Sequence, residues 1–234
     1  MGIPGIQPVH YLNLLGREGI RLDPDMVLLS LFIGNDFDKE IDTPPEIRSY
    51  LATFVHYLVT IFKGGGGKMI YHKGDYCDDC PNFDIETYLQ IEKSRLKICL
   101  TPNSVFQARL EVTLDYFKEI QELCQRIDAE FIVVLIPDEG QVNHSLQQQV
   151  IEAYREEGEN RPFNPELPNG ALAARLKQEN IELIDLYPFF ENSQNDYYRV
   201  RDSHWNIPGN RLAADRIHSS IYDRIHDESA GVEN

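Results

Sequence analysis

The sequence contains no apolar run close to the ~20 residues that a membrane-spanning helix needs. It also shows no basic segment followed by an apolar one, which is the pattern of a signal peptide. Basic residues are few: 22 lysines and arginines stand against 38 aspartates and glutamates, for a net charge of −16. Such a surface repels phosphate backbones and anionic lipids, so we expect no nucleic-acid partner and no membrane span.

Cysteine is scarce as well, with four in 234 residues, which is too few for a disulfide scaffold. The compartment stays open on these grounds. The hydrophobic fraction of 42%, by contrast, is sufficient for a packed core. A chain of this length predicts one large domain, or one domain with an insertion.

Three short apolar runs have the length of strands: residues 26–33, 131–136 and 181–186. The first two show no alternation, which favours strands covered on both faces, as in a parallel sheet. Apolar residues at helical spacing predict helices at 8–20, from 108, at 146–154, at 172–178 and after Pro208. Strands that alternate with helices predict an α/β fold built on a parallel sheet.

Region 38–107 interrupts this pattern. It holds the glycine tract 64–67 and three of the four cysteines, and its second half has no clear period. We therefore expect an irregular insertion or lid within the domain. Cys77 and Cys80, with His72 nearby, have the spacing of half a zinc site, but zinc usually takes four ligands from two such pairs. We favour a reduced or locally paired loop, and we expect no metal and no cofactor.

Two polar stretches frame the expected active site. Gly34-Asn35-Asp36 follows the first strand directly, and Asp202-Ser203-His204-Trp205-Asn206 lies between the third strand and the last helix. Ligands of parallel α/β sheets bind beyond the carboxyl ends of the strands, so the topology allows Asn35 and His204 to meet. An imidazole beside a carboxylate is the base half of a nucleophilic triad, and a side-chain amide can donate to a developing oxyanion.

Each stretch also has a simpler interpretation. All residues of the first stretch favour turns, and a lone Asp-x-His is more often a surface loop with a hydrogen-bonded histidine. Trp205 would wall a sugar or acyl pocket, or belong to the core. Asp36 would hold Asn35 in position at the pocket, or be a solvated turn charge. Asn206 is a candidate cap for the last helix, with Pro208 in its first turn.

Taken together, the two stretches resemble the SGNH/GDSL hydrolases, which are flavodoxin-like α/β esterases and acyl hydrolases with a three-layer parallel sheet. The resemblance runs over most of the chain and is weaker over 38–107. It implies that His204 is the catalytic base and that Asp202 orients it. It also implies that the side chain of Asn35 and the backbone N–H of Gly2 hold the oxyanion.

The chain departs from the family pattern in three places. The first stretch lacks the residue that the family usually has between glycine and asparagine, and the last block reads Asp-x-His instead of Asp-x-x-His. Both shorter forms resemble a branch with acyl chemistry on polysaccharides, and residues 136–139 and 183–186 resemble bacterial members, cytoplasmic or envelope-associated. No Gly-Asp-Ser block occurs. We therefore expect residues 1–234 to be a single SGNH-like domain without its first two strands and its nucleophilic serine.

The resemblance implies hydrolysis of an acyl or acetyl ester, with a small-molecule ester or a carbohydrate ester as the substrate. Two rivals are an O-acyltransferase acting on polysaccharide and a non-catalytic carbohydrate-binding or assembly protein. Without the serine, we expect little or no esterase activity from residues 1–234 alone. Without its first two strands the sheet would end at Met26–Ile33, so we also expect self-association along this edge.

Overall fold

The structure is a computed structural model that describes residues 7–37, 77–191 and 196–227, the last five in backbone only. Gly2 and residues 38–76, which make up the first half of the expected lid, lie outside the described residues. Within the described ranges, no helix is both long and apolar enough to cross a membrane.

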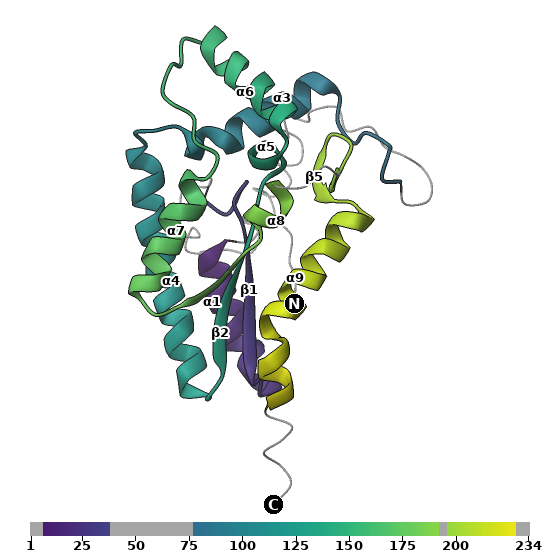
Figure 1. Cartoon of the computed structure of the whole chain (residues 1–234). Helices are drawn as coiled ribbons and strands as arrows, with labels where there is room; N and C mark the ends of the chain where they lie inside the picture. The colour runs from purple at the N-terminus through teal and green to yellow at the C-terminus, as the bar shows by residue number, and fades with distance from the viewer. Residues whose placement is uncertain (1–6, 38–76, 192–195, 228–234) are drawn as a thin grey trace, which may run out of the picture.

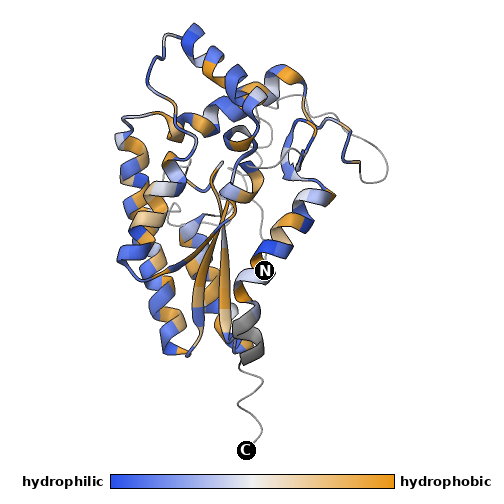
Figure 2. Cartoon of the chain, in the orientation of Figure 1, coloured by the Kyte–Doolittle hydropathy of each residue, from blue (hydrophilic) through white to orange (hydrophobic). Residues whose placement is uncertain are grey.

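The sheet has three parallel strands in the order β1-β2-β3, namely β1 (Met26–Phe32), β2 (Glu130–Ile136) and β3 (Glu182–Asp185). Met26 lies opposite Glu130 in the first pair of strands, and Ile132 lies opposite Glu182 in the second. The three predicted strands and the α/β class are therefore confirmed. Figure 2 shows why these segments form the central sheet: the strands are largely apolar, whereas the helices mix apolar and polar residues.

Helices cover both faces of the sheet, which gives three layers (Figure 1). One face carries α1 (Pro8–Arg17), α4 (Ser104–Arg126) and α7 (Leu167–Gln178), with the short 3-10 helix η1 (Gly19–Leu22) after α1. The other face carries α9 (Ile207–Asp227). Alternate residues of β2 enter the two cores: Phe131, Val133 and Leu135 on the first face, Ile132 and Val134 on the second.

The sheet edge at β1 was expected to be open. Within the described residues β1 pairs with β2, and Leu28 of β1 is 40% exposed. Self-association along this edge stays a prediction, which sedimentation of the purified chain would check.

The remaining elements gather beyond the carboxyl ends of the strands (Figure 1). They are α3 (Ile85–Arg95), η2 (Leu96–Cys99), α5 (Glu139–Val142), α6 (His144–Glu156), α8 (Tyr187–Glu191), β4 (Tyr198–Arg199) and β5 (Asp202–Trp205). The last two strands pair antiparallel in a hairpin. Side chains from segments far apart in the sequence therefore meet at this edge.

The second half of the expected insertion is more regular than its sequence pattern indicates. Helix α3 is capped by Asp84, whose Oδ1 accepts a hydrogen bond from Thr87 N at 2.8 Å. The helix buries Tyr88, but it also buries Glu92 and Lys93. Because buried charged residues break the apolar period, the sequence pattern did not reveal this helix.

Side-chain caps determine where two helices begin. Helix α4 begins earlier than predicted, at Ser104, because Asn103 Oδ1 accepts a hydrogen bond from Phe106 N at 2.9 Å. The predicted cap of α9 is confirmed, since Asn206 Oδ1 accepts from Gly209 N at 2.8 Å. This second cap fixes the start of α9 directly after the hairpin that carries the Asp-x-His motif.

Candidate active site

The turn after β1 presents an amide outward and holds a carboxylate inward. Asn35 is exposed, whereas Asp36 is buried. The carboxylate of Asp36 accepts hydrogen bonds from the Tyr11 hydroxyl at 3.0 Å and from Phe32 N at 2.8 Å. Asp36 therefore shapes the turn that carries Asn35, which is one of the two roles that its sequence position left open.

Gly34 lets this turn pass close to the end of β2. A Cβ atom at this position would lie 2.1 Å from Asp138 Oδ2 and 2.6 Å from the ring of Phe32. Both distances are far inside van der Waals contact. A side chain at residue 34 would thus push the turn away from β2 and displace Asn35.

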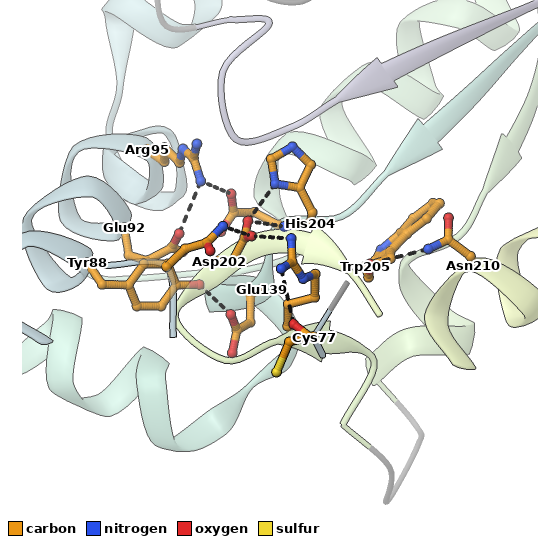
Figure 3. A network of polar contacts seen from close by, with 12 residues as sticks. Cys77, Tyr88, Glu92, Arg95, Glu139, Asp202, His204, Trp205 and Asn210 are labelled. Atoms are coloured by element: carbon orange, nitrogen blue, oxygen red, sulfur yellow. Dashed lines mark hydrogen bonds and ion pairs between the residues drawn. The ribbon is translucent and has the colours of Figure 1, made fainter. Parts of the chain in front are cut away.

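The hairpin β4–β5 holds an acid and an imidazole in contact (Figure 3). Asp202 is only 2% exposed, and its Oδ1 lies 2.5 Å from His204 Nδ1 and 3.1 Å from His204 N. The side chain of His204 is 82% exposed. A hydrogen bond from Nδ1–H to the carboxylate selects the tautomer whose Nε2 can accept a proton, as a general base requires.

The second oxygen of Asp202 has partners of its own, which the sequence did not reveal. Asp202 Oδ2 accepts from Arg199 Nη1 at 2.9 Å and from the side-chain amide of Asn82. Arg199 Nη2 also donates to the carbonyl of Cys77 at 3.1 Å. The buried carboxylate is therefore held at both oxygens.

These contacts shift the two pKa values in opposite directions. Burial works to raise the pKa of Asp202, but hydrogen bonds from His204 and the charges of His204 and Arg199 outweigh it, so this pKa lies below its usual value. The hydrogen bond to Asp202 raises the pKa of His204, opposed by partial burial and by the cations Arg199 and Arg95. His204 loses its proton, and becomes a base, only as the pH passes this raised pKa.

Asn35 and His204 line the same cavity, which has a volume of about 570 Å³. Its described lining consists of Phe32, Asn35, Arg95, Ile136, Arg199, Ser203, His204, Trp205 and Asn210. The structure thus brings together three of the residues singled out from the sequence, Asn35, His204 and Trp205. Asp202 lies behind His204, and Asp36 is not among the described lining residues.

Trp205 combines the two roles that its sequence position left open. Its ring lines the cavity, and it also stacks on Phe190 of α8, with ring centroids 5.1 Å apart and an interplanar angle of 21°. It packs against the core under α9. The cavity wall beside His204 is therefore a fixed aromatic surface.

A group of charged residues on α3 and beyond β2 underlies the cavity. Arg95 Nη1 lies 3.2 Å from Glu92 Oε1 and 3.8 Å from Asp138 Oδ2, and the guanidinium lies over the ring of Phe32. Burial raises the pKa of Glu92 well above its usual value, and Asp138 raises it further while Arg95 opposes. Arg95 carries no motif, so the sequence did not single it out.

A second cavity, of about 530 Å³, shares Arg199 with the first. Its described lining includes Asn143, Gln149, Tyr197 and Arg201, but none of Asn35, Asp202, His204 and Trp205. The guanidinium that pairs with Asp202 is therefore part of the walls of both cavities.

Cys77 and Cys80 are joined in a disulfide, which is the local pairing that the sequence left open. Among the described residues, no group of three or more histidine, cysteine or acidic side chains has the geometry of a metal site. His72 lies outside the described residues.

The SGNH class of hydrolase-like domains is defined by a parallel sheet between two layers of helices, with an Asp–His pair and a turn amide beyond the carboxyl ends of the strands. In agreement, a family model described as SGNH hydrolase-like domain, acetyltransferase AlgX, matches residues 99–232, and the chain belongs to this family. The matched range includes Asp202 and His204 and begins after Asn35 and Asn82. No curated protein and no solved structure matches the chain.

Proposed function

We propose that this protein cleaves or transfers an acyl ester, with an acetylated carbohydrate as its substrate. Asp202 and His204 would be the acid–base pair, and Asn35 would donate to the oxyanion. The observation that carries the proposal is the single cavity lined by both Asn35 and His204. Membership in an acetyltransferase-related family supports the acyl chemistry and the carbohydrate-related role.

In the proposed mechanism, His204 Nε2 removes the proton of a hydroxyl group, whose oxygen attacks the ester carbonyl carbon. The carbonyl oxygen becomes an oxyanion and accepts a hydrogen bond from Asn35 Nδ2. Asp202 stabilises the imidazolium, since its Oδ1 already contacts His204 Nδ1 at 2.5 Å. His204 then gives its proton to the leaving oxygen, the bond from the acyl carbon to that oxygen breaks, and the acyl group stays on the attacking oxygen. Water or a sugar hydroxyl, deprotonated by His204, attacks next and takes the acyl group, and His204 returns the proton to the first hydroxyl.

The hydroxyl that His204 activates does not belong to a Gly-Asp-Ser block of residues 1–234, because no such block occurs in this sequence. Ser203 lines the cavity, but it lies between the acid and the base on β5. A fluorophosphonate probe, which reacts with activated serines, should therefore leave residues 1–234 unlabelled. Labelling of Ser203 that disappears in His204→Ala would overturn this part of the proposal.

Turnover of p-nitrophenyl acetate by the protein expressed from its natural reading frame tests the mechanism. His204→Ala should lower kcat on the order of 10³-fold or more, and Asn35→Ala ~10²–10³-fold. Addition of a methyl glycoside separates the two reactions, because a hydrolase releases free acetate whereas a transferase yields the acetylated glycoside. Equal turnover of the wild type and both variants would refute the assigned roles.

The missing Gly-Asp-Ser block favours one second candidate, a carbohydrate-binding protein without turnover. For this candidate, acetylated glycans would bind the natural protein without release or transfer of acetate. Binding should then survive in His204→Ala, whereas the enzymatic proposal requires that this variant loses turnover.

A further inference from the structure

The segment 77–82 lies against the hairpin and the start of α9, although more than a hundred residues separate them in the sequence. We call this segment the clasp; the disulfide between Cys77 and Cys80 closes it. Polar contacts of the clasp join Cys77 O to Arg199 Nη2, Asp78 O to Val200 N, Asp78 Oδ2 to Ile207 N, and Asn82 Nδ2 to Asp202 Oδ2. Both strands of the hairpin therefore contact one short segment.

We propose that the clasp positions the acid of the Asp–His pair, with Asn82 and Arg199 as positioning residues. This inference rests on the proposed function only for the statement that His204 is the base. Neither Asn82 nor Arg199 needs to touch the substrate for this role, since both act through Asp202.

The geometry at Asp202 supports the proposal. The carboxylate has two oxygens, and Asn82 and Arg199 both bind Oδ2, so rotation of the carboxylate is opposed and Oδ1 stays directed at His204 Nδ1. Asp202 is 2% exposed, so water cannot easily replace a lost partner. A buried acceptor that loses its donor is free to reorient or to draw in other partners.

The charges around His204 show how the clasp would affect the pKa of this histidine. The hydrogen bond from Asp202 is the main cause of the raised pKa of His204, and Arg199 and Arg95 act against it. A displaced Asp202 carboxylate would leave the two cations as the dominant neighbours. The pKa of His204 should then fall toward its ordinary value.

The clasp is a feature of this chain rather than of the matched family range. Cys77, Cys80 and Asn82 all precede residue 99, where the match to the family model begins. Asp202 and His204 lie inside it. A pair inside the matched range is thus contacted by a segment from outside that range.

Titration of the His204 ring by NMR in residues 1–234 tests the proposal, with the signal assigned by its loss in His204→Gln. Asn82→Ala and the double variant Cys77→Ser/Cys80→Ser break the clasp from its two ends without changing the net charge. Each should lower the pKa of His204 by about half a unit or more, and combining them should add little, because both release the same carboxylate. The matched control is Asp79→Glu, an exposed, charge-conserving change in the same segment that should leave the pKa of His204 unchanged.

An unchanged or raised pKa of His204 in both variants, with the thermal unfolding midpoint preserved, overturns the proposal. Reduction of the folded wild type by a phosphine, which yields two thiols and the phosphine oxide, repeats the test without a mutation. It should lower the pKa of His204 as the double serine variant does. NMR titration does not depend on turnover. A lowered pKa of His204 in the clasp variants, together with equal turnover of the natural protein and its His204→Ala variant, would therefore refute the proposed function and leave the role of the clasp intact.

Discussion

The two halves of the candidate site are held in different ways. The turn that carries Asn35 is fixed by Asp36 within the turn and by the close approach of Gly34 to Asp138, which follows the neighbouring strand β2. The hairpin that carries His204 depends on contacts to Asn82, which is 120 residues away in the sequence. The Asn35 side is thus built on two neighbouring strands of the sheet, whereas the His204 side is also contacted by a segment outside the sheet.

The largest effect is expected on the hairpin side. Asp202→Asn should lower kcat on the order of 10³–10⁴-fold, because an amide at this position no longer selects the productive tautomer of His204. Steady-state kinetics on an acetyl ester would measure it. Asp196→Asn, an exposed change close to the hairpin, is the matched control and should keep full activity. A loss below tenfold for Asp202→Asn would mean that the hairpin does not orient the base.

On the turn side, the expected effect is on stability. Gly34→Ala should reduce the free energy of unfolding by about 1–3 kcal/mol, because its Cβ would overlap the Asp138 carboxylate. Chemical denaturation would measure the change. Gly170→Ala on α7 is the control: a Cβ there meets nothing within 4 Å, so the change should stabilise by about 1 kcal/mol. An equal change in the free energy of unfolding for Gly34→Ala and Gly170→Ala would show that no steric constraint acts at this turn.

Changes in pH should act on activity and stability in opposite senses. Burial raises the pKa of Glu139, the first residue of α5, to about 7, against hydrogen bonds from Tyr88 and Asn143 that lower it. The folded state then keeps a proton that the unfolded state releases near pH 4.5, so stability should fall as the pH rises from about 4.5 to 7. Activity should rise over the range above pH 6.5 as His204 loses its proton.

Denaturation between pH 5 and pH 8 would show the stability change, which should be about 1–2 kcal/mol smaller in Glu139→Gln. Glu152→Gln, an exposed change on α6, should retain the wild-type dependence. If Glu139→Gln and Glu152→Gln reduced the pH dependence of stability equally, that dependence would come from the overall charge instead.

The smallest expected effect lies at the base of the turn. Tyr11→Phe removes the hydrogen bond to Asp36 and leaves the one from Phe32 N, so the free energy of unfolding should fall by about 1 kcal/mol. The pKa of His204 should not move, since the change is confined to the turn side. Tyr116→Phe on α4 serves as the matched control for loss of a hydroxyl, and a shifted pKa of His204 in Tyr11→Phe would show that the two halves are coupled.

The same division explains what could be predicted from the sequence. The strands, most of the helices and the Asn206 cap were predicted because their signals are local: apolar runs, helical spacing and a capping residue next to its helix. The positions of Asn35 and His204 at one edge followed from the direction of parallel strands. Roles for Gly2 stay a prediction, because that residue lies outside the described ranges.

Asn82, Arg95 and Arg199 could not be assigned in this way. Each is a polar residue whose importance comes from a contact made only after folding, and two of them lie in a region without apolar period. The one local signal there was the Cys77-x-x-Cys80 spacing, which predicted a paired loop as one possibility and gave no indication of what the loop would touch.

Trp205 is an intrinsic fluorescence probe of the candidate site. It is the only tryptophan in the chain, and its ring forms part of the wall beside His204 while stacking on Phe190. All tryptophan emission therefore originates at the site itself, and it is separated from that of the 12 tyrosines by excitation at a wavelength that only tryptophan absorbs. Ligand entry and loosening of the hairpin should each change that emission, so both can be followed in unlabelled protein by intrinsic fluorescence.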